Sequence, residues 1–214
     1  MSRRLLAWCA VLVGSLVWSQ VASAHPASRD KYSLRSAIRL TDDGLDVVVV
    51  LEVPMQIVTG ALKERLKSTE GATDRRAAAQ KVVSTYAEEQ WADMAKGLTL
   101  TMNGKPLAGS WAPRDDRYNG KGAVSEGFFL YIMEFRPQGP VAVGTDVTFT
   151  VHDEIYPDVP MVYSAWVIAG KGWDVASDSS AALMPDGPYL INSPAFWVED
   201  PALRHLEVRY VKAP

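Results

Sequence analysis

Two segments of alternating apolar and polar residues, joined by an Asp-Gly turn, define the start of the folded part of this chain. "YSLRSAIRL" at residues 32–40 alternates with a period of two, and "LDVVVVLEV" at residues 45–53 is rich in β-branched residues. The four residues between them, 41–44, read Thr-Asp-Asp-Gly, and an Asp-Gly pair between two such segments is a strong β-hairpin signal. The sequence therefore predicts two antiparallel strands here.

The hydrophobic period changes from two to 3.6 after this hairpin. Residues 54–67 predict a helix that begins with Pro54, at a position where the missing N–H costs nothing. Gly71 interrupts the pattern, and a second helix is predicted from about residue 73 to residue 96, ending at Gly97. Apolar residues of the second helix recur three and four apart: Val83, Ala87, Trp91 and Met94. We expect this stripe to pack on a sheet.

Almost every later segment predicts a strand. "LTLTMNG" ends in the turn signal Asn103-Gly104, and "KPLAGSW" is its expected hairpin partner. Residues 113–127 are polar and glycine-bearing, which is typical of a loop. Five further strands are expected at residues 128–135, 145–153, 162–170, 189–193 and 203–211.

These elements predict a mostly β protein. We expect an antiparallel β-sandwich of about 8–10 strands, with a helical insertion of two helices, at about residues 54–97, after the second strand. Residues 25–214 would form this single domain. The alternative is an α+β fold in which the long helix lies across one face of a single sheet.

The first 24 residues have the pattern of a secretory signal peptide. Two arginines at positions 3 and 4 precede an apolar run at residues 5–18, and Ala-Ser-Ala at residues 22–24 is a typical cleavage site. The apolar run is shorter than a membrane span requires. The only cysteine, Cys9, lies inside this leader, so the processed chain would have no disulfide or thiolate site. We therefore expect a periplasmic protein.

Charge and composition argue against several classes of partner. The leader holds two of the 22 basic residues and none of the 25 acidic ones, so the processed chain has a net charge of −5. No basic run suggests nucleic-acid binding, and no second apolar stretch is long enough to span a membrane. The chain also has no nucleophile elbow, and "AGKG" at residues 169–172 lacks the length of a phosphate loop. We expect a protein that is not an enzyme.

The new N-terminus suggests metal binding. Cleavage after Ala24 would make His25 the first residue, and its amine and Nδ1 could together chelate Cu²⁺ or Ni²⁺. Pro26 has no backbone N–H to deprotonate, so this site would have two nitrogens and would need further ligands. His152 and Asp153 are the preferred candidates, although in a strand they point to opposite faces and one site would use only one of them. Further candidates are Glu154, Asp30 and His205, the last of which is more typical of a solvated or packed residue.

Several stretches together resemble a known family. They are "AHP" before "YSLRSAIRL", the hairpin region "GLTLTMNGKPL", and "FFLYIMEF" followed by "GTDVTFTVHDEIYPDVP". This ensemble, over about residues 24–172, resembles the periplasmic N-terminal domain of HupE/UreJ-like and related nickel/cobalt transporter-type membrane proteins. The resemblance implies metal handling at the envelope and a membrane-transporter partner. It also implies that Asp153, Tyr156 and Pro157 correspond to the acidic and aromatic-proline motif of that family.

The sequence thus favours a non-catalytic periplasmic accessory module that handles Cu, Ni or Co. His25 would supply the amine and imidazole, and His152 or Asp153 would complete the site. The alternative is an envelope protein–protein interaction module with no metal role. Such a module would use the acidic surface, the long helix or the aromatic-rich final third of the chain.

Overall fold

The computed structural model describes residues 31–42, 44–114, 123–125, 128–176 and 201–214. The predicted leader, His25 and the predicted strand at 189–193 lie outside these ranges. The helical elements are α2 (Met55–Leu66), η1 (Lys67–Thr69), α3 (Arg75–Gly97) and η4 (Pro201–Arg204). The strands are β1 (Tyr32–Thr41), β2 (Gly44–Pro54), β3 (Leu98–Met102), β4 (Lys105–Pro106), β5 (Gly109–Pro113), β6 (Ala123–Ser125), β7 (Phe128–Pro137), β8 (Asp146–Asp153), β9 (Met161–Ala169), β10 (Trp173–Val175) and β11 (His205–Lys212).

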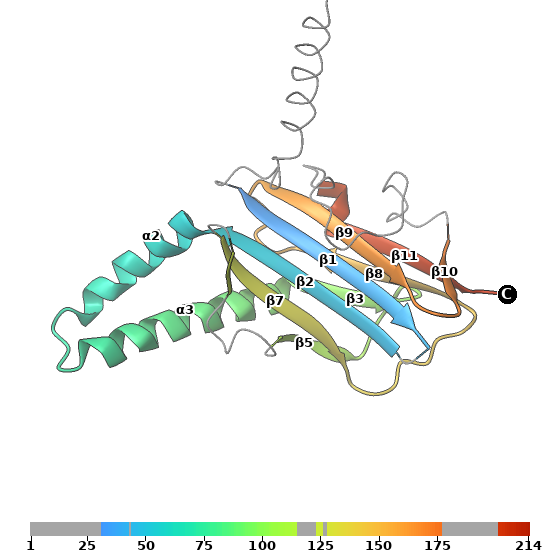
Figure 1. Cartoon of the computed structure of the whole chain (residues 1–214), viewed down its shortest axis with the longest axis horizontal. Coiled ribbons are helices and arrows are strands. Elements are labelled where there is room, and N and C mark those ends of the chain that lie inside the picture. The colour runs from blue at the N-terminus through green and yellow to red at the C-terminus, as the bar shows by residue number, and fades with distance from the viewer. Residues whose placement is uncertain (1–30, 43, 115–122, 126–127, 177–200) are drawn as a thin grey trace, which may run out of the picture.

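The described strands form two sheets that pack face to face, as Figure 1 shows. The first sheet has the order β5-β7-β2-β1-β9, with β6 paired to β7, and the second has the order β10-β11-β8-β3-β4. The predicted mostly β sandwich, with two helices after the second strand, is confirmed. Two described strands were not predicted, β6, which lies within the predicted loop at residues 113–127, and β10; each has three residues.

The core lies between the two sheets and follows the alternation of the sequence. On β1, Leu34, Ile38 and Leu40 are almost fully buried, while Arg39 between them is exposed. The hairpin register pairs Leu40 with Leu45 across the predicted turn. Because successive side chains of a strand point to opposite faces, this period-two pattern fixes which face of each strand joins the core.

One strand pair is parallel, whereas the prediction was an antiparallel sandwich. β1 pairs with β9 in parallel register, from Tyr32 opposite Met161 to Leu40 opposite Ala169. The chain leaves the second sheet at the end of β8, and the rings of Tyr156 and Tyr32 lie 5.9 Å apart. β9 therefore starts next to the start of β1 and runs in the same direction.

The predicted partner of β3 is divided between the two sheets. Only Lys105 and Pro106 pair with β3, and the chain then crosses to the other sheet, where β5 pairs with β7. The last backbone hydrogen bond to β3 is donated by the N–H of Leu107 to the carbonyl of Leu100, at 3.0 Å. Gly109 permits the close approach of β5 to β7, because a Cβ there would lie 2.4 Å from a ring carbon of Phe135.

The helices α2 and α3 form a hairpin, here called the helical arm (residues 55–97), which projects from one end of the sandwich (Figure 1). α3 begins at the N-cap Asp74, whose carboxylate accepts the N–H of Ala77 at 2.9 Å. Its fully buried residues, Tyr86, Ala87 and Met94, all lie in the half that joins the sandwich. The expectation that the apolar stripe packs on a sheet is confirmed for Ala87, Trp91 and Met94, which join the core of the sandwich. The alternative of a helix lying across a single sheet is wrong, because the strands form two sheets.

No helix in the described ranges combines the length and the apolar character that a membrane crossing requires.

Candidate functional site

Four chain segments meet at the end of the sandwich where the helical arm is attached. These segments are the end of β8, the start of β11, the start of β1 and the C-terminus of α3. The N–H of Glu154 donates to the carbonyl of Gly97 at 2.8 Å, and the hydroxyl of Tyr156 donates to Oε1 of Gln90 at 2.5 Å. A Cβ at Gly97 would lie 2.9 Å from the backbone nitrogen of Ile155, so the end of α3 fits tightly against this segment.

His152 and His205 lie side by side on the outer face of the second sheet. They are directly opposite each other in the antiparallel register of β8 and β11, and their ring centroids are 5.6 Å apart. Both side chains are accessible to solvent, with His205 the more exposed. We call these two residues the histidine pair.

Glu154 supplies a carboxylate next to the histidine pair. Its Oε1 is 3.3 Å from Nε2 of His152, and its side chain is 73% exposed. Nδ1 of His152 is buried and makes no hydrogen bond. The nitrogen of His152 that remains available to a ligand from solvent is therefore Nε2, the atom that faces Glu154.

These separations are close to those of ligands that share one metal ion. With metal–nitrogen distances of about 2.0–2.1 Å, two imidazoles on one ion have ring centroids roughly 4.5–5.2 Å apart, and neighbouring donor atoms lie roughly 2.9–3.4 Å apart. The histidine pair exceeds the first range by a few tenths of an ångström, and His152 and Glu154 fall within the second. Within the described residues, however, no group of three His, Cys, Asp or Glu side chains is already positioned to hold a metal ion.

Asp153 lies on the opposite face of β8, inside the sandwich. Its carboxylate accepts the N–H of Ile155 at 2.7 Å and a bond from Nη1 of Arg204 at 3.2 Å. Arg204 also donates to the hydroxyl of Tyr163 at 2.8 Å and to the carbonyls of Ile155 and Tyr156. Because Arg204 directly precedes His205, this network fixes the start of β11 against the end of β8 and so holds the histidine pair together.

The metal ligands that the sequence suggested are thus not brought together. His25 lies outside the described residues, and His152 and Asp153 point to opposite faces, as the period of a strand predicts. The carboxylate of Asp153 is engaged by Arg204 and Ile155, so the carboxylate near His152 is that of Glu154 instead. No local sequence signal singles out His205, because only the register between two strands that are distant in the chain places it beside His152.

Burial raises the pKa of Asp153 from its ordinary value of 3.8 to about 6, because the loss of hydration outweighs the N–H of Ile155 and the charge of Arg204. Since the pKa is higher in the folded protein, the folded state binds the proton more tightly. The resulting stabilisation is complete below about pH 4 and is lost as the pH rises through 6.

We predict that Asp153→Asn changes the pH dependence of stability. Relative to this variant, the wild-type protein should lose about 3 kcal/mol of unfolding free energy between pH 4 and pH 7, because two pKa units correspond to about that energy. Urea denaturation in metal-free buffer at each pH measures the difference. The comparison with Asn removes the pH dependence that the two proteins share. Parallel pH curves for the two proteins would contradict the prediction.

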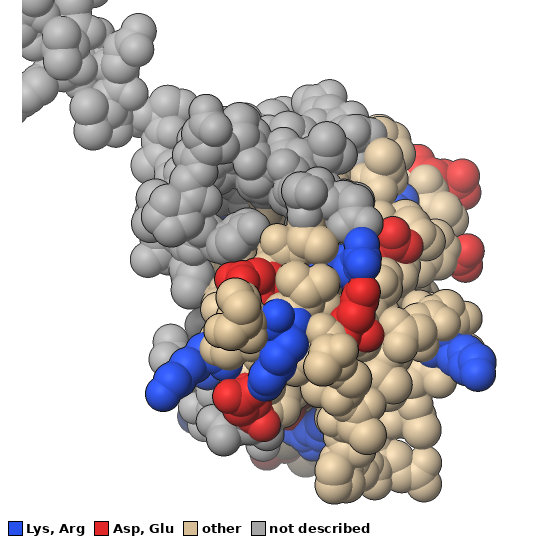
Figure 2. Space-filling view, turned by 90° about the vertical axis from the view of Figure 1, so that its right-hand side faces the viewer, with Lys and Arg blue, Asp and Glu red and all other residues tan. Residues whose placement is uncertain are grey.

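The opposite end of the sandwich, where the C-terminus lies, has a different character. Figure 2 shows Lys and Arg interspersed there with Asp and Glu, with no area of one sign. Arg209 pairs with Asp146 at 2.7 Å, and Lys212 pairs with Asp42. This end therefore has the features of a solvated, charge-balanced surface.

No protein-family model matches this chain, and no curated protein matches its sequence. The resemblance to the periplasmic domain of nickel/cobalt transporter-type proteins remains a prediction from the sequence.

Proposed function

We propose that this chain is a non-catalytic periplasmic accessory module that binds a divalent transition metal at the histidine pair. The observation that carries the proposal is the placement of His152 and His205 directly opposite each other, with Glu154 at 3.3 Å from His152. Two imidazoles and one carboxylate are donors that suit Cu²⁺ and Ni²⁺. The resemblance to nickel/cobalt transporter-type proteins supports a role in metal handling.

The processed N-terminus would complete this site. β1 begins at Tyr32, whose ring contacts Tyr156, four residues beyond His152. The seven residues that precede Tyr32, from His25 to Lys31, can span up to about 24 Å when extended, which is more than the spacing of about 10 Å between two packed sheets. The amine and imidazole of His25 would add two nitrogens to those of the histidine pair.

The expected metal preference follows from these ligands. Up to three imidazoles, one amine and one carboxylate would form a tetragonal site of nitrogen and oxygen donors, the geometry that Cu²⁺ and Ni²⁺ prefer. Affinity at such a site is higher for Cu²⁺ than for Ni²⁺ in the ordinary order of stability. Binding should weaken as the pH falls, because protons compete with the metal for the imidazole and amine nitrogens.

We predict that His205→Ala weakens Cu²⁺ binding by at least about tenfold, because it removes one ligand and leaves the rest of the site in place. Isothermal titration of the chain that starts at His25, with Cu²⁺ and then Ni²⁺, measures the change. His152→Ala should have a similar or larger effect. His205 is exposed, so the fold should be retained, which circular dichroism would verify.

Two controls separate the parts of the site. A chain with one extra residue before His25 displaces the amine and should weaken binding without abolishing it, while His205→Ala in that chain should weaken it further. Glu207→Gln changes another exposed residue of β11, two positions further on the same face, and should leave the affinity within about twofold. Equal Cu²⁺ affinity for the wild-type protein and His205→Ala would refute the proposed site.

A further inference from the structure

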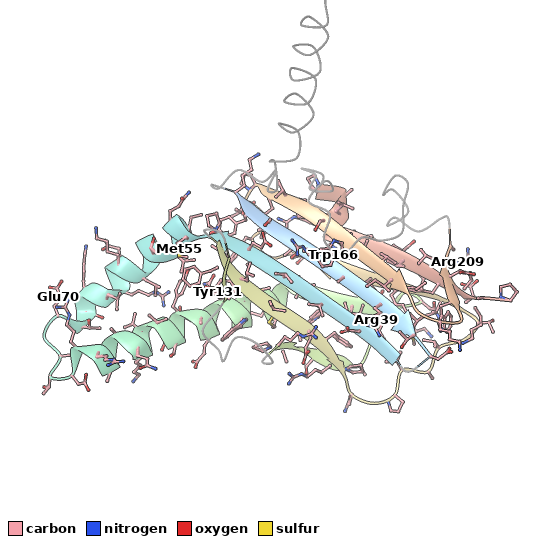
Figure 3. The ribbon with its side chains drawn as sticks, viewed as in Figure 1. Arg39, Met55, Glu70, Tyr131, Trp166 and Arg209 are labelled. Atoms are coloured by element: carbon pink, nitrogen blue, oxygen red, sulfur yellow. The ribbon has the colours of Figure 1, made fainter. Side chains whose placement is uncertain are left out.

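Most side chains of the helical arm are exposed or only partly buried. In Figure 3, Met55 marks its base next to the sheets, and Glu70 marks its tip at the far end. Val58 is the only buried residue described in α2. In the outer half of the arm, apolar residues such as Leu62, Leu66 and Val82 are only half-buried. The two helices there contact each other and leave the rest of their surfaces open.

A groove of about 480 Å³ runs along this outer half. Its residues from α2 and η1 recur at spacings of three and four, so they lie on one face of the helix. They are Thr59, Leu62, Lys63, Leu66 and Lys67, and the groove is completed by Glu70 and Arg75. Leu62 and Leu66 give it an apolar strip, with the cations of Lys63 and Arg75 beside them.

The outer half of the arm is basic, although the chain as a whole is acidic. Residues 62–82 contain six Lys or Arg and three Asp or Glu, whereas the whole chain has a net charge of −3. Two of the six cations are paired, Lys67 with Glu64 and Arg65 with Glu89. Across the part of the chain that the structure covers, the other four have no ion-pair partner: Lys63, Arg75, Arg76 and Lys81.

We propose that this groove is the docking site for an acidic amphipathic helix of a partner protein. An apolar strip flanked by unpaired cations complements a helix that carries leucine-type residues on one face and carboxylates beside them. This inference is independent of the metal site, which lies at the base of the arm.

The residues at the tip argue against a membrane surface as the occupant. The tip, residues 70–74, reads Glu-Gly-Ala-Thr-Asp, with two acidic residues and no large apolar side chain. An anionic lipid surface would repel these carboxylates, and membrane insertion needs bulky apolar residues that this segment lacks. Of the unpaired cations, Lys63 and Arg75 line the groove, where a helix can lie parallel to α2.

The test is a fluorescence anisotropy titration of the whole chain, in chelator-treated buffer. The probe is a labelled peptide of about 20 residues, with leucine at helical spacings of three and four and glutamate at most other positions. The reference probe is a scrambled peptide of the same composition, which has equal charge and no apolar face. We expect the amphipathic peptide to bind at least about tenfold more tightly than the scrambled one, because only it can use the apolar strip.

The variant Lys63→Glu/Arg75→Glu should weaken amphipathic-peptide binding by at least about tenfold, since it reverses two of the three cations that line the groove, and the third, Lys67, is already paired with Glu64. The matched control Lys105→Glu/Lys171→Glu makes the same charge change at exposed positions outside the arm and should alter the affinity by less than about twofold. Both variants change only exposed side chains, and thermal melting would confirm that they fold.

Three results would overturn the proposal. Equal affinity for the scrambled and the amphipathic peptide would show that the binding is non-specific charge attraction. Binding to anionic phosphatidylglycerol vesicles, lost in Lys63→Glu/Arg75→Glu and without peptide binding, would make the occupant a membrane. Self-association in sedimentation, lost in the same variant and without peptide binding, would make it a second copy of this chain.

Discussion

Replacing Arg204 by methionine is expected to lower the free energy of unfolding by about 3–5 kcal/mol, because it leaves the buried carboxylate of Asp153 without its counter-ion. The side chain of Asp153 is 1% exposed and that of Arg204 is 14% exposed, so water cannot replace the lost partner. The carbonyls of Ile155 and Tyr156 and the hydroxyl of Tyr163 would lose a donor at the same time. Urea denaturation at pH 8, followed by tryptophan fluorescence, measures the loss.

Arg209 offers a matched control on β11, the strand that begins directly after Arg204. Arg209 on β11 also pairs with an aspartate, Asp146, but both side chains are largely exposed, at 40% and 51%. Arg209→Met should therefore cost much less than Arg204→Met, because water can solvate the freed carboxylate. In an Asp153→Asn background, the loss on removing Arg204 should also shrink, since no buried charge is left unpaired. Equal losses for the two arginine variants would show that burial of Asp153 is not the cause.

Arg204→Met should also affect the candidate metal site. Arg204 directly precedes His205 and binds the segment that follows His152, so its loss should loosen the contact between the two strands at the histidine pair. We expect Arg204→Met to weaken Cu²⁺ binding although Arg204 is not itself a ligand. This effect depends on the proposed metal site, whereas the loss of stability does not.

The elements of this fold could be predicted from the sequence because their signals are local. The period-two segments and their Asp-Gly turn predict β1 and β2, and the change of period after Pro54 predicts α2 and α3. The opposite orientation of His152 and Asp153 also follows from the strand period alone. Each of these signals depends on residues within a few positions of one another.

The relations between distant segments could not be predicted in this way. The parallel pairing of β1 with β9 and the pairing of His152 with His205 join segments that are far apart in the chain. No local pattern encodes which strand lies beside which, because that choice depends on the packing of the whole sandwich. The stripe of α3 predicted contact with a sheet, and Ala87, Trp91 and Met94 make that contact. An apolar helix face does not specify how far the helix projects beyond the sheet that it meets, so the helical arm could not be predicted.

Tyr210→Ala is expected to lower the free energy of unfolding by about 3–5 kcal/mol, because it leaves a cavity where the two sheets meet. Tyr210 is fully buried on β11, and its ring lies 6.2 Å from that of Phe149, edge to face. Its hydroxyl reaches across the core to the first sheet, where it donates to the carbonyls of Ile38, at 3.0 Å, and Ile168, at 3.2 Å. The side chain therefore connects the second sheet to both strands of the parallel β1–β9 pair.

A second substitution separates packing from hydrogen bonding. Tyr210→Phe keeps the ring and removes only the hydroxyl, so it should cost about 1–2 kcal/mol, because two buried carbonyls lose a donor. Val211→Ala, at the next position and on the outer face, should cost less than either. Urea denaturation of the three variants would give this order. If Tyr210→Phe were as damaging as Tyr210→Ala, the hydroxyl contacts to Ile38 and Ile168, rather than the filling of the core, would be what holds the two sheets in register.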